Sequence, residues 1–489
     1  MIPQGVTIQH PDRLFIGGEW VAPLGGGQIE IVNPNSEEVV ARVAEARKDD
    51  MDRAVAAARQ AFDHGPWPTT PPAERGARLM KMIDHLEARV PELAAAWTAQ
   101  VGGLASFAPI MHGGAIAGLR GIAALGDSFD WVTQQKGQVV DTAIITREPV
   151  GVVVGIAPWN APFGIMANKV FYALVAGCPI IMKPSPETPL EAFIIAEAAE
   201  AAGMPAGTVN LVPGEREAAD HLIHSRDIDK VTFTGSSAAG MHIAGVCGSK
   251  MTRCTMELGG KSAAIIRDDF PIEAAAGILG NTITVMSGQV CAMLSRAIVT
   301  KDRHDELAEA IAGVMKGIKI GNSENPETQL GPLAMKRQLD RVEMYIEEGK
   351  KTADLVTGGA RPAHMNKGYF IEPTLFANVD NTSRIAQEEI FGPVLCLIPA
   401  EDEEDAIRIA NESNFGLNGS VLTADPQAAY DISRRIRTGV MGQNGMRMEF
   451  GMPFGGFKQS GMGREGGPEG LWPYLETKTI LLDGAPARL

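Results

Sequence analysis

Short apolar runs rich in β-branched residues alternate with helix-length segments between Val150 and Ile266. The apolar runs are GVVVGIA, PIIMK, TVNLV, VTFTGS and CTMEL, and the segments between them predict helices at about 166–176, 190–202 and 215–224, with a further helix ending near 246. This alternation is typical of βαβ units, in which helices cover both faces of a parallel sheet. It predicts a doubly wound domain of the dinucleotide-binding kind.

A second alternation starts near Pro271. It predicts one helix that ends near 286 and others at about 302–318 and 335–349, with strands at RAIVT, ADLVTGG, VLCLI and SVLTA. We therefore expect a second doubly wound α/β domain. The residues up to about 130 are predicted to be mostly helical after FIGGEW and to pack against the first sheet.

The chain is acidic, with a formal net charge of -15 over 489 residues. Nucleic acid and anionic membrane surfaces are disfavoured as partners, because both would repel such a chain at long range. No apolar run approaches the ~18 residues that a membrane span needs, and the first residues lack the pattern of a secretory signal. These features favour a cytoplasmic protein that acts on a small molecule.

Five cysteines are widely spaced, without a CxxC pair or histidines at metal-ligand spacing. The sequence therefore predicts neither a disulfide framework nor a metal site. Cys291, in MSGQVCAM, has small and polar neighbours that favour a loop where backbone approaches a ligand. A thiolate there would be a strong nucleophile, although a cysteine taken at random is more often a buried structural residue.

Three further strings could carry chemistry. Glu257 ends the run CTME before two glycines, either as a general base for water or as a surface carboxylate beside a turn. Asn160, in IAPWNAPF, offers an amide that fits an oxyanion hole or ordinary turn chemistry. Gly235 and Ser236, in FTGSSAAG, lie between a strand and a helix, in a pyrophosphate-binding turn or a simple helix N-cap.

These strings, in this order, resemble the aldehyde dehydrogenase superfamily. Matches cover about residues 12–482 and include LFIGGEWV, IVNPNSEEVVARV, REPVGVVVGIAPWNAPF, KPSPETP, EEIFGPV, NFGLNGSV and PFGGFKQSGMGRE. The resemblance implies an NAD(P)-dependent enzyme of the hydrolytic, non-acylating type, which oxidises an aldehyde to a carboxylic acid.

The resemblance also implies an α/β fold with two doubly wound parallel-sheet domains and a small oligomerisation arm. The Rossmann-like cofactor-binding domain would comprise residues 1–129 and 147–255, and the catalytic domain residues 256–445. Residues 130–146 and 446–489 would form oligomerisation and bridging segments, and the protein would be a homodimer or homotetramer.

By resemblance, Cys291 would attack the aldehyde carbonyl to give a thiohemiacetal, and loss of hydride to the nicotinamide would leave a thioester. The Asn160 amide and the Cys291 backbone N–H would hold the oxyanion, and Glu257 would activate the hydrolytic water. Lys169 and Glu476 occupy positions that resemble the family's proton-relay lysine and glutamate.

For the cofactor, the resemblance implies that Lys183 meets the adenosine ribose and that Gly235 and Ser236 meet the pyrophosphate. Glu389 and Phe391 would hold the nicotinamide ribose and ring. Further residues of the same site would be Ile156, Pro158, Trp159, Gly214 and Leu258.

One position departs from the pattern of strict NAD users, which often carry a glutamate three residues after the lysine. Here that position is Pro186, and the acid, Glu187, follows one residue later. Without a carboxylate at the ribose, repulsion of a 2′-phosphate weakens, so we expect NAD with NADP possible.

The positions that resemble the family's substrate tunnel are almost all apolar: Phe163, Met166, Met293, Met446, Met448 and Phe454. A flexible apolar tunnel favours an aliphatic, terpenoid or aromatic aldehyde over a charged semialdehyde. Any one of these methionines could equally fill core.

Three other readings of the chain stay open. Enzymes that pass the acyl group to coenzyme A generally lack the base glutamate, so Glu257 argues for hydrolysis. A non-catalytic, crystallin-like structural protein would have no need of intact Cys291, Glu257 and Asn160. A cysteine hydrolase without redox chemistry would not need the strings of the nicotinamide site.

Overall fold

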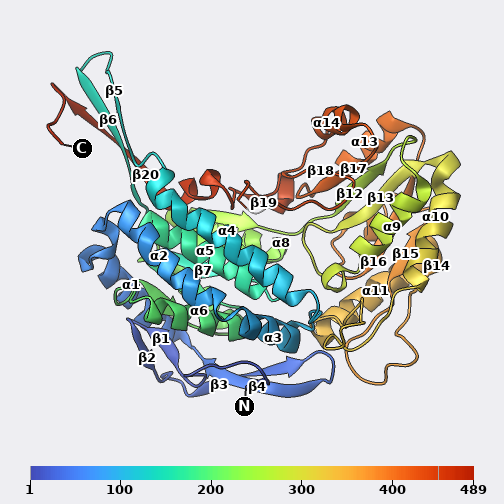
Figure 1. The fold of residues 1–489 in the computed structure, drawn as a ribbon, viewed down its shortest axis with the longest axis horizontal. Coiled ribbons are helices and arrows are strands. Elements are labelled where there is room, and N and C mark those ends of the chain that lie inside the picture. The colour runs from blue at the N-terminus through green and yellow to red at the C-terminus, as the bar shows by residue number, and fades with distance from the viewer. Residues whose placement is uncertain (1, 450, 489) are drawn as a thin grey trace.

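The structure is a computed structural model that describes residues 2–449 and 451–488. Two lobes are each built around a large sheet, and a narrow arm projects from the first lobe (Figure 1). The prediction of two α/β domains with mostly parallel sheets is confirmed, although both sheets are mixed rather than purely parallel.

The first sheet has eight strands in the order β19-β11-β10-β7-β8-β9-β1-β2. Its five central strands run parallel, and β1 and β19 lie antiparallel to their neighbours β9 and β11. The strands are β1 (Leu14–Ile16), β2 (Glu19–Val21), β7 (Val153–Ile156), β8 (Ile180–Lys183), β9 (Val209–Leu211), β10 (Lys230–Thr234), β11 (Arg253–Glu257) and β19 (Gly461–Met462). The sheet thus takes strands from both ends of the chain.

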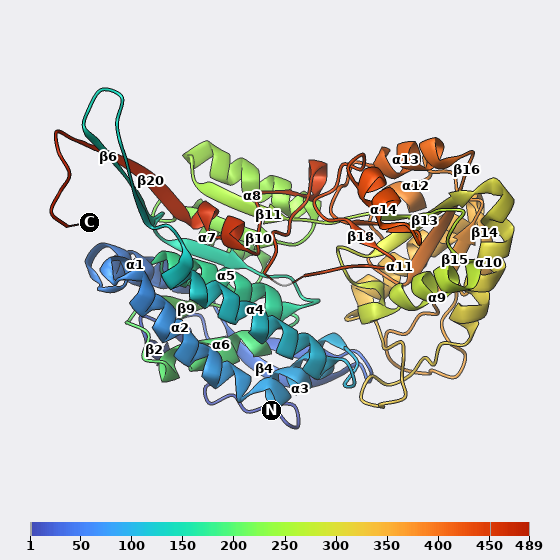
Figure 2. The ribbon, with the colours of Figure 1, turned by 45° about the horizontal axis from the view of Figure 1, so that its top comes forward.

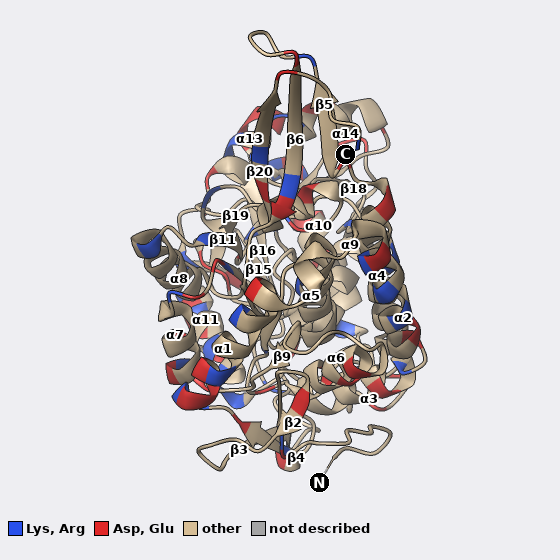
Figure 3. Cartoon of the chain, turned by 90° about the vertical axis from the view of Figure 1, so that its left-hand side faces the viewer, with Lys and Arg blue, Asp and Glu red and all other residues tan. Residues whose placement is uncertain are grey.

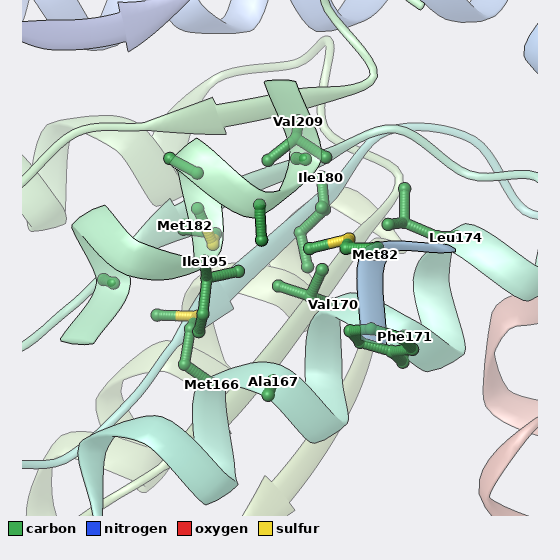
Figure 4. Close-up of a cluster of buried hydrophobic side chains, with 14 of the residues drawn as sticks. Met82, Met166, Ala167, Val170, Phe171, Leu174, Ile180, Met182, Ile195 and Val209 are labelled. Carbon is green, nitrogen blue, oxygen red and sulfur yellow. The ribbon is translucent and has the colours of Figure 1, made fainter. Parts of the chain in front are cut away.

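Helices cover both faces of this sheet, as the alternation predicted. One layer contains α2 (Pro72–Glu87), α3 (Val90–Val101), α4 (Ala108–Ser128), α5 (Pro162–Ala176) and α6 (Leu190–Ala201). The other contains α1 (Lys48–His64), α7 (Arg216–His224) and α8 (Ser237–Lys250). Figure 4 shows the packing in the first layer, where Val170 and Leu174 of α5 meet Ile180 of β8 and Met82 of α2.

The second sheet has seven strands in the order β14-β15-β16-β13-β12-β17-β18, all parallel except β14. They are β12 (Ser262–Ile266), β13 (Leu294–Thr300), β14 (Asp354–Thr357), β15 (Thr374–Ala377), β16 (Val394–Ala400), β17 (Gly419–Leu422) and β18 (Gly442–Gln443). One face packs against α9 (Ile272–Thr282) and α10 (Lys301–Lys316). The other packs against α11 (Lys336–Thr352), α12 (Arg384–Gln387), α13 (Glu403–Asn411) and α14 (Pro426–Ser433).

The arm is a three-stranded antiparallel sheet of β5 (Val132–Gln135), β6 (Thr142–Pro149) and β20 (Leu475–Leu482), with β6 in the centre (Figure 2). In Figure 3, which turns the left-hand side of Figure 1 toward the viewer, β6 lies between β20 and β5. In the arm, β6, which follows residue 140, pairs with β20 near the C-terminus. The bridging roles expected for residues 130–146 and 446–489 stay predictions. Within the described ranges, no helix is long and apolar enough to cross a membrane.

The prediction that the residues up to about 130 are mostly helical is confirmed by α1 to α4, and two details of secondary structure differ from expectation. Residues 27–45 are not helical but form the hairpin β3 (Gly27–Asn33) and β4 (Glu38–Glu45), in which Ile29 and Ile31 point inward with the two-residue period of a strand. Helix α9 ends at Thr282 instead of near 286, because Met286 takes a left-handed backbone conformation.

A buried arginine ties the second sheet to a covering helix. Arg296 on β13 is 1% exposed and donates to the carbonyls of Lys261, Ile409 and Ala410 and to the Asn381 side chain, all at 2.9–3.0 Å. The guanidinium therefore satisfies the last carbonyls of α13 inside the domain.

Replacing Arg296 with Met should lower the free energy of unfolding by about 3 kcal/mol, since it leaves several buried carbonyls without a donor. Urea unfolding followed by circular dichroism measures this change. Arg408→Met, on the exposed side of α13, is the control and should stay within about 0.5 kcal/mol of the parent. Equal midpoints for the two variants would contradict the assigned role.

Candidate active site

A cleft of about 810 Å³ is lined by residues of both lobes. It gathers nine of the ten cofactor residues predicted from the sequence: Ile156, Pro158, Trp159, Lys183, Gly235, Ser236, Leu258, Glu389 and Phe391. Cys291 and Asn160 line the same cleft. Gly214 is not among the lining residues, because it packs against Ala46 and Met51, and its neighbour Glu215 lines the cleft instead.

The amino end of α8 opens onto this cleft. Strand β10 ends at Thr234, and the Ser236 side chain caps the helix by accepting from the Ala239 backbone N–H at 3.3 Å. The N-cap reading of FTGSSAAG is confirmed, and the pyrophosphate-binding reading stays a prediction for a helix end that lines the cleft. Such an end favours a negatively charged group.

Lys183 lies at the end of β8 and is 6% exposed. Burial lowers its pKa to about 8, while the charges of Glu187 and Glu215 act in the opposite direction. Glu187 accepts a hydrogen bond from Ser185 and forms an ion pair with Arg337 of α11 at 2.5 Å. The acid that follows Pro186 is therefore engaged with a cation from the other lobe.

Glu389 enters the cleft from the second lobe. Its carboxylate accepts the Gly260 backbone N–H at 3.0 Å, and burial raises its pKa to about 7. A Cβ on Gly259 would lie 2.4 Å from this carboxylate, so the approach requires a glycine. The Phe391 ring meets Trp159 edge-on, with centroids 5.2 Å apart.

The loop that carries Cys291 is held in a strained turn. Met286 and Ser287 have φ of 51° and 56°, and at Gly288, with φ of 73°, a Cβ would lie 2.2 Å from the Gly392 backbone. The Asn160 side-chain amide donates to the Gln289 carbonyl at 2.8 Å, just before Cys291. The amide predicted for the oxyanion hole is therefore bound to the cysteine loop.

The Cys291 thiol is strongly disfavoured from ionising. Burial, followed by the charges of Glu389 and Glu257, raises its pKa to about 12. A lowered pKa would favour the thiolate nucleophile, and the pKa of Cys291 instead lies above the ordinary value. A thiolate at this position therefore needs a nearby positive charge or a base that takes the proton.

Glu257 lies at the end of β11 and is 4% exposed. Neither carboxylate oxygen has a hydrogen-bond partner among the described residues. Burial and the charge of Glu465 raise its pKa well above the ordinary value, only partly opposed by Lys169 and Arg464. The surface-carboxylate reading is therefore wrong, and the carboxylate is free to accept a proton.

Lys169 on α5 is fully buried and pairs with Glu465, and its Nζ also lies 3.2 Å from Thr232 Oγ1. The expected partner, Glu476, lies on β20 in the arm, where it pairs with Arg253. Assigning Glu476 as the partner of Lys169 is thus wrong. Glu465 was not predicted as a site residue, although it is the last residue of PFGGFKQSGMGRE, one of the strings that resemble the family.

The predicted substrate positions separate into two groups. Phe163 and Met166 are each 1% exposed in the core of the first lobe, and Met293 is buried in the second, so none of the three can line an open tunnel. Figure 4 shows Met166 inside the first core. The remaining positions stay accessible in part: Met446, Met448 and Phe454.

Two of the three misplaced positions, Phe163 and Met166, follow from the geometry of α5, whereas Met293 lies just before β13 and packs into the core of the second lobe. On α5 the half-buried positions are Gly164, Ile165 and Asn168, whereas Phe163 and Met166 lie on the opposite, core-facing side.

All five cysteines are free, and no cluster of potential metal ligands occurs in the described part of the chain.

A two-lobed α/β fold in which Cys291, the Glu389 carboxylate and the amino end of α8 line one cleft is typical of an oxidoreductase of the pyridine-nucleotide class. Residues 20–480 match the Aldehyde dehydrogenase family. The chain belongs to this family, and it is an oxidoreductase.

Individual relatives agree with this assignment. A geranial dehydrogenase from Castellaniella defragrans is 40% identical over 98% of this chain and 100% of its own length. A Mycobacterium tuberculosis aldehyde dehydrogenase complexed with NAD+ superimposes with a TM-score of 0.95 at 42% identity, covering 97% of this chain and 99% of its own. An aldehyde dehydrogenase from Pseudomonas syringae, complexed with NAD+ and octanal, has a TM-score of 0.94 at 37% identity and covers 99% of both chains.

In the free protein at about pH 7.5, iodoacetamide should modify Cys254 before Cys291, because only thiolates react and a hydrogen bond from Cys247 lowers the pKa of Cys254 to about 7. Removing a neighbouring negative charge with Glu389→Gln should accelerate the modification of Cys291. Peptide mass spectrometry over time measures both rates. Faster labelling of Cys291 than of Cys254 in the parent would contradict the raised pKa.

Proposed function

We propose that the protein oxidises an apolar aldehyde to its carboxylic acid with NAD+, through a thiohemiacetal and a thioester on Cys291. The observation that carries this proposal is the hydrogen bond of Asn160 to the Gln289 carbonyl, inside a dinucleotide-sized cleft that Cys291 also lines. This bond supports the proposal because it joins the Asn160 amide to a residue two positions before Cys291, which lines the same cleft.

The residues of the cleft fit a dinucleotide. The amino end of α8 with Ser236 suits a pyrophosphate, Lys183 suits the adenosine ribose, and the Glu389 carboxylate suits the hydroxyls of the nicotinamide ribose. When bound, the nicotinamide supplies the hydride acceptor and a positive charge. This charge would offset the carboxylates that raise the pKa of Cys291.

In the proposed first half-reaction, the Cys291 thiol releases its proton to solvent, and the thiolate Sγ then forms a bond to the carbonyl carbon of the aldehyde. The negative charge on the carbonyl oxygen is held by Asn160 Nδ2 and by the Cys291 backbone N–H. Asn160 Nδ2 has two N–H groups, and because one is engaged with the Gln289 carbonyl, the other is left for the oxyanion. Loss of hydride from the carbon then leaves a thioester.

In the second half-reaction, Glu257 takes a proton from water, which attacks the thioester and releases the acid. A buried carboxylate with a raised pKa is a stronger base than an exposed one, and its free oxygens can accept from water. Glu465, paired with Lys169, lies within electrostatic range of Glu257 and is the proposed next acceptor of that proton. The presence of Glu257 favours water over coenzyme A as the acyl acceptor.

For the substrate we propose an apolar aldehyde of the terpenoid, aliphatic or aromatic type. The partly accessible side chains Met446, Met448 and Phe454 support it, and Met448 is 47% exposed. The relatives named for geranial and bound to octanal agree with such a substrate. A 3-succinoylsemialdehyde-pyridine dehydrogenase from Pseudomonas, 36% identical over 96% of this chain, makes a semialdehyde that carries a pyridine ring the alternative.

For the cofactor we propose NAD+, which the structures of the relatives from Mycobacterium tuberculosis and Pseudomonas syringae hold, with NADP+ as the alternative. Glu187 is already paired with Arg337, so it is not free to repel a 2′-phosphate.

We further propose that the arm joins copies of the chain into a dimer or tetramer, since exposed apolar residues such as Ile480 and Leu481 occur on its outer strand.

The reaction is tested by following reduced nicotinamide absorbance with geranial, octanal, benzaldehyde and succinic semialdehyde, each with NAD+ and with NADP+. We expect turnover of the three apolar aldehydes and little of the charged one. Cys291→Ala should lower kcat by at least about 1,000-fold, since the nucleophile is removed. No turnover of any aldehyde with either cofactor would refute the assignment.

Glu257→Gln should leave the first hydride transfer intact and slow thioester hydrolysis, because the amide cannot accept a proton from water. Stopped-flow absorbance should then show a burst of reduced cofactor of about one equivalent per site, followed by a steady rate lowered about 100-fold. A steady-state rate equal to that of the parent would remove Glu257 from the mechanism.

A further inference from the structure

A buried polar pair lies behind the loop that carries Asn160. The side chains of His112 on α4 and Glu191 on α6 are both fully buried, and Nε2 of the histidine lies 2.6 Å from Oε1 of the glutamate. Neither residue lines the cleft or takes part in the proposed reaction. Burying two titratable groups is costly, so their placement calls for a role.

The pair contacts the first turn of α5, immediately after Asn160. Pro162, the first helical residue, has no backbone N–H, so Phe163 carries the first donor of the helix. This N–H interacts with the Glu191 carboxylate, which also accepts from Gln100 Nε2 at 3.4 Å. The His112 ring lies against the Phe163 ring, with centroids 5.5 Å apart.

The other side of the same cluster holds Asn160 directly. The indole N–H of Trp97, a fully buried residue of α3, donates to the Asn160 carbonyl at 2.9 Å. The Trp97 ring meets the His112 ring edge-on, at a centroid distance of 6.2 Å. Asn160 is thus fixed by its carbonyl to Trp97, by its amide to the Gln289 carbonyl, and by the helix that follows it to Glu191.

We propose that the buried His112–Glu191 pair positions Asn160 for oxyanion binding, by fixing the start of α5 and the Trp97 indole. His112, Glu191 and Trp97 are positioning residues, since none of them touches the reacting atoms. The inference rests on the proposed function, in which the Asn160 amide holds the oxyanion.

The pair needs one shared proton to hold together. His112 Nδ1 lies 2.7 Å from the Ala108 carbonyl and must carry a hydrogen there, so a second hydrogen is needed between Nε2 and Glu191. Burial lowers the pKa of His112, but the hydrogen bond and charge of Glu191 outweigh it, so the pKa lies above the ordinary value. Burial also raises the pKa of Glu191, only partly opposed by His112.

The sign of the pH effect follows from both shifts. Because the folded protein holds the proton more tightly than free histidine does, the interaction is complete at low pH and is lost as pH rises through the raised pKa of His112. The groups facing the pair are Gln100 on α3, the Ala108 carbonyl on α4 and the Phe163 N–H on α5. Loss of the proton sets a nitrogen lone pair against a carboxylate.

Two substitutions of Glu191 separate positioning from packing. Glu191→Met keeps the length of the side chain but removes the acceptor, and kcat should fall about ten-fold, part of the ~100- to 1,000-fold loss that follows removal of an oxyanion donor. Glu191→Gln should restore most of kcat, because its amide donates to neutral His112 while its carbonyl accepts from Phe163. KM for NAD+ should not change in either variant, since the pair lies outside the cleft.

The pH profile gives a readout that packing alone would not move. The amide introduced by Glu191→Gln cannot titrate, so the ratio of kcat for this variant to that of the parent should rise with pH above neutrality. Glu197→Met is the matched control, because Glu197 is a buried glutamate of the same helix that pairs with Arg89. Trp97→Phe, which removes the indole donor to Asn160, should also lower kcat at unchanged KM for NAD+.

Equal kcat for Glu191→Met and Glu197→Met, or a pH-independent ratio for Glu191→Gln, would overturn the inference. If Glu191→Met does not fold, the ratio for Glu191→Gln decides by itself. Asn160→Ala, measured in parallel, distinguishes a failure of the proposed function from a failure of the positioning role. Unchanged kcat in Asn160→Ala would refute the oxyanion role in the proposed function, whereas a loss of about 100-fold beside a silent Glu191→Met would refute only the positioning.

Discussion

The hydrogen bond between the Asn160 amide and the Gln289 carbonyl is the interaction on which the site depends. Asn160 follows β7 of the first sheet, and Gln289 precedes β13 of the second, so the bond connects the two lobes at the cysteine loop. Its geometry requires both lobes to present irregular backbone at the same point. The strained turn at Met286 and Ser287 and the close approach at Gly288 meet that requirement on the second lobe.

Electrostatics in the cleft interior follow from burial more than from net charge. Glu257 is buried and Glu389 and Cys291 are half-buried at the cleft, and partial or full removal from water is the largest cause of the raised pKa of each. Three groups that resist ionisation surround the place where the proposed reaction needs a base, a ribose ligand and a nucleophile. A bound cation would stabilise the ionised forms of all three at once.

Local signals at strand ends and glycine turns were sufficient for the fold class and for cleft residues such as Asn160, Gly235 and Cys291. The other cleft residues were predicted from the family resemblance. The sequence was insufficient where the direction of a side chain determines whether it lies in the core or at the site. Phe163 and Met166 share α5 with Lys169, yet the helix turns them into the core, and Glu476 lies on an arm strand that sequence alone could not orient. His112 and Glu191 have no motif, since their meeting depends on the packing of α4 against α5 and α6.

Glu465 reaches Lys169 from the segment that continues, through Tyr474, into the arm strand β20. The interior acid and the outermost strand are therefore joined by a short stretch of continuous backbone. A displacement of the arm, whether by contact with another molecule or by cleavage near its base, would act through this backbone on the buried pair of Glu465 and Lys169. The protruding sheet is thus connected through the backbone to Glu465, the proposed acceptor of the proton from Glu257.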